Sequence, residues 1–141
     1  MKKEDFLNIK YISQAEVEVT GANIADVKIE LISKISQLRE QVGSPFYFQK
    51  NGITTGDHKS PEHPNGEAGD GWFGGNWDWK RIKETYVKAV RLGFNGIGIY
   101  HNSIMYSWHL DIGKDIRDWT AKKKIGDNNW IYGKLLLDPK A

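Results

Sequence analysis

The segment 49–76 constrains this fold more than any other feature, because it is long and has the composition of a loop. Glycine, proline, asparagine, aspartate and serine are frequent in it, and these residues favour turns over helices and strands. A structureless loop of this length is uncommon inside a compact domain, and such loops usually carry function. We therefore expect functional side chains in this polar segment and regular elements on both sides of it.

Regular elements are predicted before and after the polar segment. Apolar residues recur every three or four positions in 23–43 and in 77–92, which predicts two helices. A short strand is predicted at 46–48, and the stretches 96–100 and 104–112 form a predicted hairpin. A short helix near 115–122 and a strand at 130–132 would follow. This order predicts one α+β domain over 1–141, with a small antiparallel β-sheet and flanking helices.

Composition excludes several kinds of protein. The net charge of the 141-residue chain is only +2, whereas a nucleic-acid-binding protein usually has a concentrated basic face, so we expect no nucleic-acid partner. There is no cysteine, which excludes disulfides and thiolate metal sites. The basic N-terminus is not followed by an apolar run, so no signal peptide is predicted, and no stretch is long enough to span a membrane.

Histidines and carboxylates gather at two places in the sequence. The polar segment contains His58 and His63 together with four acidic residues, and His109 lies on a predicted hairpin strand two positions before Asp111. Zinc sites without cysteine usually have three histidine or carboxylate ligands and a water molecule. These residues therefore allow a metal site, although histidines in polar loops are also commonly just solvated.

A motif within the polar segment gives these residues a more specific interpretation. The residues His63-Pro-Asn-Gly-Glu-Ala-Gly-Asp70 match the pattern H-x-x-G-x-A-x-D, and the stretches 96–100 and 108–113 supply a second histidine followed by x-D. In this the chain resembles the zinc D-Ala-D-Ala carboxypeptidase and dipeptidase family, which includes phage endolysins. That family shares its fold with lysostaphin-type peptidases and the N-terminal domain of hedgehog proteins. The resemblance covers a peptidase-like core of about 23–119.

The resemblance implies a role for each motif residue. His63, Asp70 and His109 would be the ligands of one Zn²⁺ ion, and Asp111 would stand behind the metal and orient a ligand imidazole. Gly66 would allow the tight turn that brings His63 and Asp70 to one ion.

The chain also departs from the family pattern at two positions. No arginine occurs between Arg39 and Arg81 to hold a substrate carboxylate, so Lys50 is the candidate for that role. The usual base before the last ligand is absent, and His101 becomes the candidate to move a proton, because histidine titrates near neutral pH. Tyr106 would donate a hydrogen bond to an oxyanion. If His101 does not act, Glu62 or Glu67 in the polar segment are the alternatives.

Two functions remain open at this point. The first is a zinc metallopeptidase that hydrolyses D-alanyl or related peptide bonds in the stem peptides of bacterial peptidoglycan, with Trp72 beside the cleft as a substrate-binding residue. Such an enzyme would stay in the cytoplasm until release, or belong to a virion, and act at the cell wall. The second is a non-catalytic zinc-containing module that binds a cell wall or virion partner through the tryptophan-rich stretch 71–79.

Overall fold

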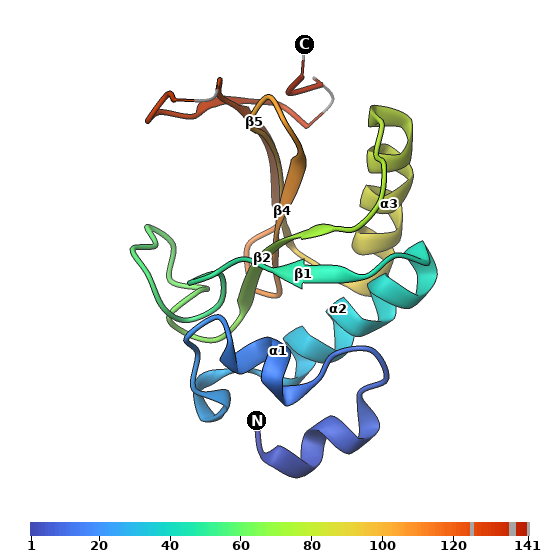
Figure 1. Ribbon diagram of the computed structural model, residues 1–141, viewed down its shortest axis with the longest axis vertical. Coiled ribbons are helices and arrows are strands. Elements are labelled where there is room, and N and C mark those ends of the chain that lie inside the picture. Colours follow the sequence, from blue (N-terminus) through green and yellow to red (C-terminus); the bar gives the residue numbers. More distant parts are fainter. Residues whose placement is uncertain (125, 136–137, 141) are drawn as a thin grey trace.

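The computed structural model describes residues 1–124, 126–135 and 138–140 (Figure 1). It confirms the α+β class. The 3₁₀ helices (η), α-helices and strands, in chain order, are η1 (Lys3–Asn8), α1 (Gln14–Glu18), η2 (Ile24–Asp26), α2 (Ile29–Val42), β1 (Phe46–Phe48), β2 (Ala68–Phe73), α3 (Trp79–Leu92), β3 (Gly96–His101), β4 (Tyr106–Asp111), β5 (Arg117–Lys122) and β6 (Ile131–Gly133).

The strands form one mixed sheet with the order β1-β2-β4-β3-β5-β6. The predicted hairpin is confirmed as the antiparallel pair β3–β4, but β5 runs parallel to β3, with Gly98 opposite Trp119. The prediction of a purely antiparallel sheet is therefore wrong. The helix predicted near 115–122 is also wrong, because these residues pair along the edge of β3 as β5.

Strand β2 lies inside the segment whose composition predicts a loop. Its glycines explain the disagreement, because the backbone around them is closely packed. A Cβ atom added at Gly71 would overlap the carbonyl oxygen of Tyr47 and lie 2.7 Å from ring atoms of Phe46. Only glycine fits there, so a central strand of the sheet has the composition of a turn.

Both long helices end at a glycine, but only α3 has a side-chain cap at its start. The helix predicted over 23–43 is interrupted. Asn23 caps the short helix η2, Val27 and Lys28 are extended, and α2 begins at Ile29. Gly43 ends α2 in the left-handed conformation, and α3 lies between the cap residue Asp78 and Gly93. Within the described parts of the chain, no helix is both long and apolar enough to cross a membrane.

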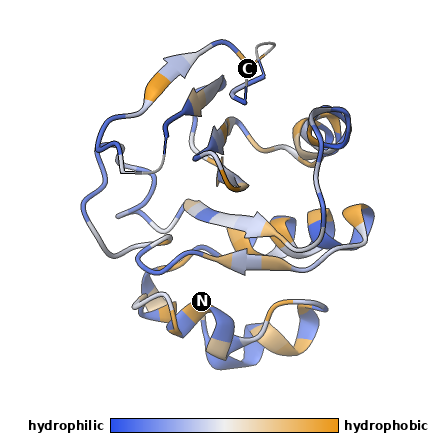
Figure 2. Ribbon diagram, turned by 45° about the horizontal axis from the view of Figure 1, so that its top comes forward, coloured by the Kyte–Doolittle hydropathy of each residue, from blue (hydrophilic) through white to orange (hydrophobic). Residues whose placement is uncertain are grey.

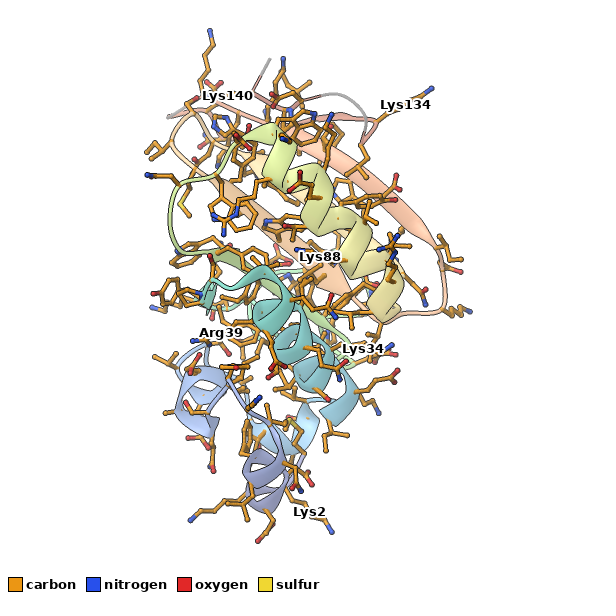
Figure 3. The ribbon with its side chains drawn as sticks, turned by 90° about the vertical axis from the view of Figure 1, so that its right-hand side faces the viewer. Lys2, Lys34, Arg39, Lys88, Lys134 and Lys140 are labelled. Carbon is orange, nitrogen blue, oxygen red and sulfur yellow. The ribbon has the colours of Figure 1, made fainter. Side chains whose placement is uncertain are left out.

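The two faces of the sheet have different surroundings. Helices α2 and α3 cover one face, and the polar segment lies on the opposite side of the sheet (Figures 1 and 3). Hydrophobic and hydrophilic residues alternate along the helices in Figure 2, as expected when one side of each helix is buried. The helix-covered face carries the core, which includes Phe46, Ile97, Ile99, Trp108 and Leu110. Because side chains alternate along a strand, His109 and Asp111 of β4 point to the other face, called here the open face.

Candidate metal centre

Three candidate ligand atoms meet on the open face of the sheet. The pairing of β2 with β4 places Asp70 directly opposite His109, and the polar segment brings His63 over this pair. Nδ1 of His109 lies 2.9 Å from Oδ1 of Asp70 and 3.2 Å from Nε2 of His63. The third distance, from Nε2 of His63 to Oδ1 of Asp70, is 3.3 Å. We call these three atoms the donor triad.

The outer partners of the two imidazoles decide which nitrogens carry hydrogen. Nδ1 of His63 lies 2.8 Å from the carbonyl oxygen of Ile53, so this nitrogen must donate. Nε2 of His109 lies 2.6 Å from Oδ2 of Asp111, so it donates as well. In the neutral rings, the opposite nitrogens therefore direct their lone pairs into the donor triad. Three acceptors that face one another require a cation or a proton between them.

The spacing of the donor triad fits a tetrahedral zinc ion. Ligand bonds of about 2.0–2.1 Å in a tetrahedral site place neighbouring ligand atoms about 3.4 Å apart. The three distances within the triad lie between 2.9 and 3.3 Å, so an ion needs only small outward movements of the side chains. Both imidazoles also donate to an outer acceptor, which is the usual arrangement for metal-binding histidine.

A third histidine adjoins this triad. The ring of His58 stacks on the ring of His63 with centroids 3.7 Å apart, and its Nε2 lies 2.7 Å from two carbonyl oxygens of its own loop. Ligand atoms of His58, His63 and Asp70 lie within 4.8 Å of one another, so this second group could also hold a metal ion. The two groups share His63 and Asp70. The tighter spacing of the donor triad favours His109 as the third ligand.

Asp111 is held behind His109 by several groups. Its side chain is fully buried, and besides the His109 ring it contacts the amide of Gly113 at 3.0 Å and Nη2 of Arg117 at 2.9 Å. The same guanidinium nitrogen lies 3.2 Å from Oε2 of Glu62, a buried oxygen that has no hydrogen-bond partner in the described part of the chain. Arg117 thus neutralises two buried carboxylates and fixes the group that orients His109.

We predict that Asp111→Asn weakens zinc binding about 10–100-fold, the usual effect of losing an outer-shell partner. The amide carries no charge to hold the His109 ring in its present orientation. Competition with a chromophoric chelator measures the affinity. Asp118→Asn is the matched control, because Asp118 lies on the same strand as Arg117 but is exposed and bonds Tyr86. Equal affinities of the Asp111→Asn and unmodified proteins would contradict the role given to Asp111.

The charges of the triad shift the pKa values of its members in the metal-free protein. Burial raises the pKa of Asp70, but hydrogen bonds from His109 and His63 outweigh it and lower the pKa to about 2. Burial lowers the pKa of His109, but hydrogen bonds to Asp111 and Asp70 raise it to about 9. Without a metal ion, a proton on His109 therefore supplies the positive charge that the triad requires.

This shift predicts a pH dependence of stability in the chelator-treated protein. A pKa of His109 near 9, above the ordinary 6.5, stabilises the fold at pH values below 6.5. That stabilisation is lost as the pH rises through 9. We expect the melting temperature, followed by circular dichroism, to fall over this interval, and to fall less in His109→Ala. Identical pH profiles for the two proteins would contradict the assignment.

The donor triad lies in an open cleft with a volume of about 620 Å³. The cleft is bordered by the polar segment on one side and by strands β3, β5 and β6 on the other. Its lining combines aromatic rings with polar and charged side chains. These residues are Gln49, Asp57, His58, Lys59, Ser60, His63, Asp70, Tyr100, Ser107, Trp108, His109, Arg117, Trp119, Trp130 and Tyr132.

Several residues proposed from the sequence lie away from this cleft. His101 and Tyr106 pair across β3 and β4 on the helix-covered face, with ring centroids 4.8 Å apart, so the sheet separates them from the donor triad. Tyr106 also stacks on Trp79 of α3. The structure therefore corrects the expectation that His101 moves a proton at the metal and that Tyr106 contacts an oxyanion there.

The two candidates for substrate binding do not line the cleft either. Lys50 is an exposed turn residue, although its neighbour Gln49 does line the cleft. Trp72 is half-buried on the open face of β2 and packs against Tyr47, with ring centroids 5.9 Å apart. Neither side chain lies where it was expected, beside the metal cleft.

Of the cleft residues, sequence reasoning proposed only His63, Asp70 and His109 for the site, and His58 and Arg117 are among those it missed. His58 lies five positions before His63 in the same polar segment, and this proximity was a usable signal. Arg117 reaches the cleft because β5 is a strand beside β3, whereas a helix was predicted there, which would not place Arg117 at the cleft.

Comparisons of the chain with protein family models, with curated proteins and with solved structures found no match. The function is therefore inferred from the residues and the geometry of this site.

Proposed function

We propose that this protein is a zinc-dependent peptidase that cuts D-alanyl or related bonds in the stem peptides of bacterial peptidoglycan. The observation that carries the proposal is the donor triad at the wall of an open cleft, formed by the residues of the H-x-x-G-x-A-x-D motif and by His109. The motif also supports a fold like that of the zinc D-Ala-D-Ala peptidases. Release from the cell or incorporation into a virion would bring the protein to its substrate.

The chain's own residues have distinct tasks in this proposal. His63, Asp70 and His109 would hold the zinc ion, and Asp111 keeps the His109 ring oriented. When bound, zinc lowers the pKa of a coordinated water to about 7 and polarises a carbonyl group. Lys59 brings positive charge to the cleft, where an anionic group of a stem peptide can lie. The ring of His58 lies beside His63 and faces the same cleft.

A second function is favoured by the position of His58. If this ring joined His63, Asp70 and His109 on one ion, the zinc would have four protein ligands. Closed four-coordinate zinc is typical of structural sites, whereas catalytic sites keep one position open. The protein would then be a non-catalytic zinc-containing module that binds the cell wall or a virion partner.

Hydrolysis of purified peptidoglycan separates the two functions. We expect new amino groups to appear in the presence of zinc and to stop appearing when a chelator is added, with mass spectrometry identifying the bond that was cut. Readdition of zinc should restore the reaction. A zinc-loaded protein that produces no new amino groups from peptidoglycan of several chemotypes would contradict the peptidase proposal and support the binding module.

A further inference from the structure

Four aromatic residues form one wall of the cleft, and we call them the aromatic wall. They are Tyr100 of β3, Trp119 of β5, Trp130 just before β6, and Tyr132 of β6. The wall begins at the candidate metal centre, since the ring centroids of Trp119 and His109 are 5.1 Å apart. It ends at Tyr132, which is 65% exposed at the edge of the sheet.

The rings of the wall hold one another in place. Nε1 of Trp119 donates a hydrogen bond of 2.8 Å to the hydroxyl of Tyr100. The ring of Tyr100 meets those of Trp119 and Trp130 edge-on, with centroids 6.4 and 5.0 Å apart. Such contacts fix ring orientations before a ligand arrives, so the part of the wall formed by Tyr100, Trp119 and Trp130 is preformed.

Gly98 explains how the ring of Trp119 lies. A Cβ atom at Gly98 would stand on the open face and meet three atoms of the Trp119 indole at 2.5–2.7 Å. Because these atoms lie at nearly the same distance, the ring covers the glycine roughly flat against the sheet. Its other face is then turned toward the cleft that it lines. Cations border the wall: Cζ of Arg117 lies 5.6 Å from the centroid of the Trp119 ring, and Nζ of Lys123 lies 4.6 Å from that of Trp130. A ligand that stacks here would therefore meet aromatic faces with positive charge beside them.

The remaining lining of the cleft indicates what kind of ligand would stack there. Neutral hydrogen-bonding groups are supplied by Gln49, Ser60 and Ser107, and charges of both signs by Asp57 and Lys59. A nucleic acid would require a mainly basic groove. An apolar side chain would favour an enclosed apolar pocket. A pyranose ring has an apolar C–H face and a rim of hydroxyls, and it matches an aromatic face bordered by polar side chains.

We propose that the aromatic wall is a saccharide subsite that holds the sugar to which a stem peptide is attached. This inference rests on the proposed function only in placing the peptide of the same molecule at the metal centre. The wall starts in contact with a candidate zinc ligand, and each peptide residue spans at most about 3.6 Å. Sugar and scissile bond can therefore occupy the cleft together, and a glycopeptide binds more tightly than its free peptide.

Binding of the N-acetylglucosamine trisaccharide to the zinc-loaded protein tests the subsite directly. We expect saturable changes in tryptophan fluorescence, and about tenfold weaker binding by Tyr132→Ala and Trp130→Ala, the usual size of a lost stacking contact. Tyr47→Ala is the matched control, because Tyr47 is also an exposed tyrosine on an edge strand but lies outside the cleft. It should bind the trisaccharide normally. No saturable binding, or equal weakening by Tyr47→Ala, overturns the inference.

Kinetics with muramyl pentapeptide and the free pentapeptide test the link to hydrolysis. We expect a KM about tenfold lower for the glycopeptide, and we expect Tyr132→Ala to reduce this advantage while Tyr47→Ala retains it. Hydrolysis of both substrates with equal KM, together with no trisaccharide binding, overturns the subsite and leaves the peptidase proposal standing. Saturable trisaccharide binding without hydrolysis of either substrate or of cross-linked peptidoglycan supports the subsite and overturns the peptidase proposal.

Discussion

Substituting His109 by alanine is expected to abolish stoichiometric zinc binding, and substituting His63 should have the same result. Each change removes one of three donor atoms that lie within 3.3 Å of one another. Loss of an outer-shell partner alone weakens metal binding 10–100-fold, so loss of a ligand should weaken it by about 10³-fold or more. Zinc content after dialysis, measured by atomic absorption, gives the result.

His58→Ala is the informative comparison for these two variants. It removes a histidine that stacks on His63 but leaves the donor triad complete. We expect this variant to keep close to one zinc ion per chain. Retention of zinc by His109→Ala together with its loss from His58→Ala would instead assign the metal to the group formed by His58, His63 and Asp70.

The second large effect is expected at Gly66, which lies in the turn between His63 and Asp70. Its φ is +71°, and an added Cβ would overlap the carbonyl oxygen of Asp26 and lie 2.8 Å from Cα of Val27. A left-handed conformation costs a non-glycine residue roughly 1–2 kcal/mol, and overpacking typically adds about 1–3 kcal/mol. We expect Gly66→Ala to lower the free energy of unfolding by about 2–5 kcal/mol and to weaken zinc binding.

Gly43→Ala separates the two contributions. Gly43 has nearly the same φ, +73°, but an added Cβ there meets nothing within 4 Å. Gly43→Ala should therefore lower the free energy of unfolding only by the cost of the left-handed conformation, roughly 1–2 kcal/mol. Urea denaturation of the two variants, with and without chelator, measures the difference. Equal losses of stability would show that close packing against residues 26 and 27 does not hold the turn.

The parts of the fold that were predictable from the sequence are those with regular patterns. Alternation and a short turn identified the hairpin of β3 and β4, and the position of His109 two residues before Asp111 placed both on one face. The helix α3 was predicted to within two residues, because its apolar periodicity coincides with capping at Asp78 and Gly93. Residues that are close together in the sequence determine these features, so they can be predicted without knowledge of the tertiary structure.

The parts that were not predictable depend on distant contacts. Strand β2 needs glycine because Tyr47 and Phe46 of β1 press against it, and such residues otherwise indicate a loop. Strand β5 forms because the edge of β3 is available, whereas the local sequence also suits a short helix. The first hairpin strand was predicted to end at residue 100, but His101 is the last residue of β3. It lies three positions after Gly98, the residue paired with His109, so its side chain points to the opposite face.

The distances along the chain between the candidate ligands have a consequence for stability. His63 and His109 are 46 positions apart, and Asp70 and His109 are 39 apart, yet their donor atoms meet. An ion held by all three would act as a reversible cross-link in a chain that has no cysteine. Because the unfolded chain does not hold these atoms together, a bound ion stabilises only the folded state, by RT ln(1 + [ion]/Kd). The melting temperature would then report the free zinc concentration, and scarcity of the ion would loosen the polar segment from the sheet.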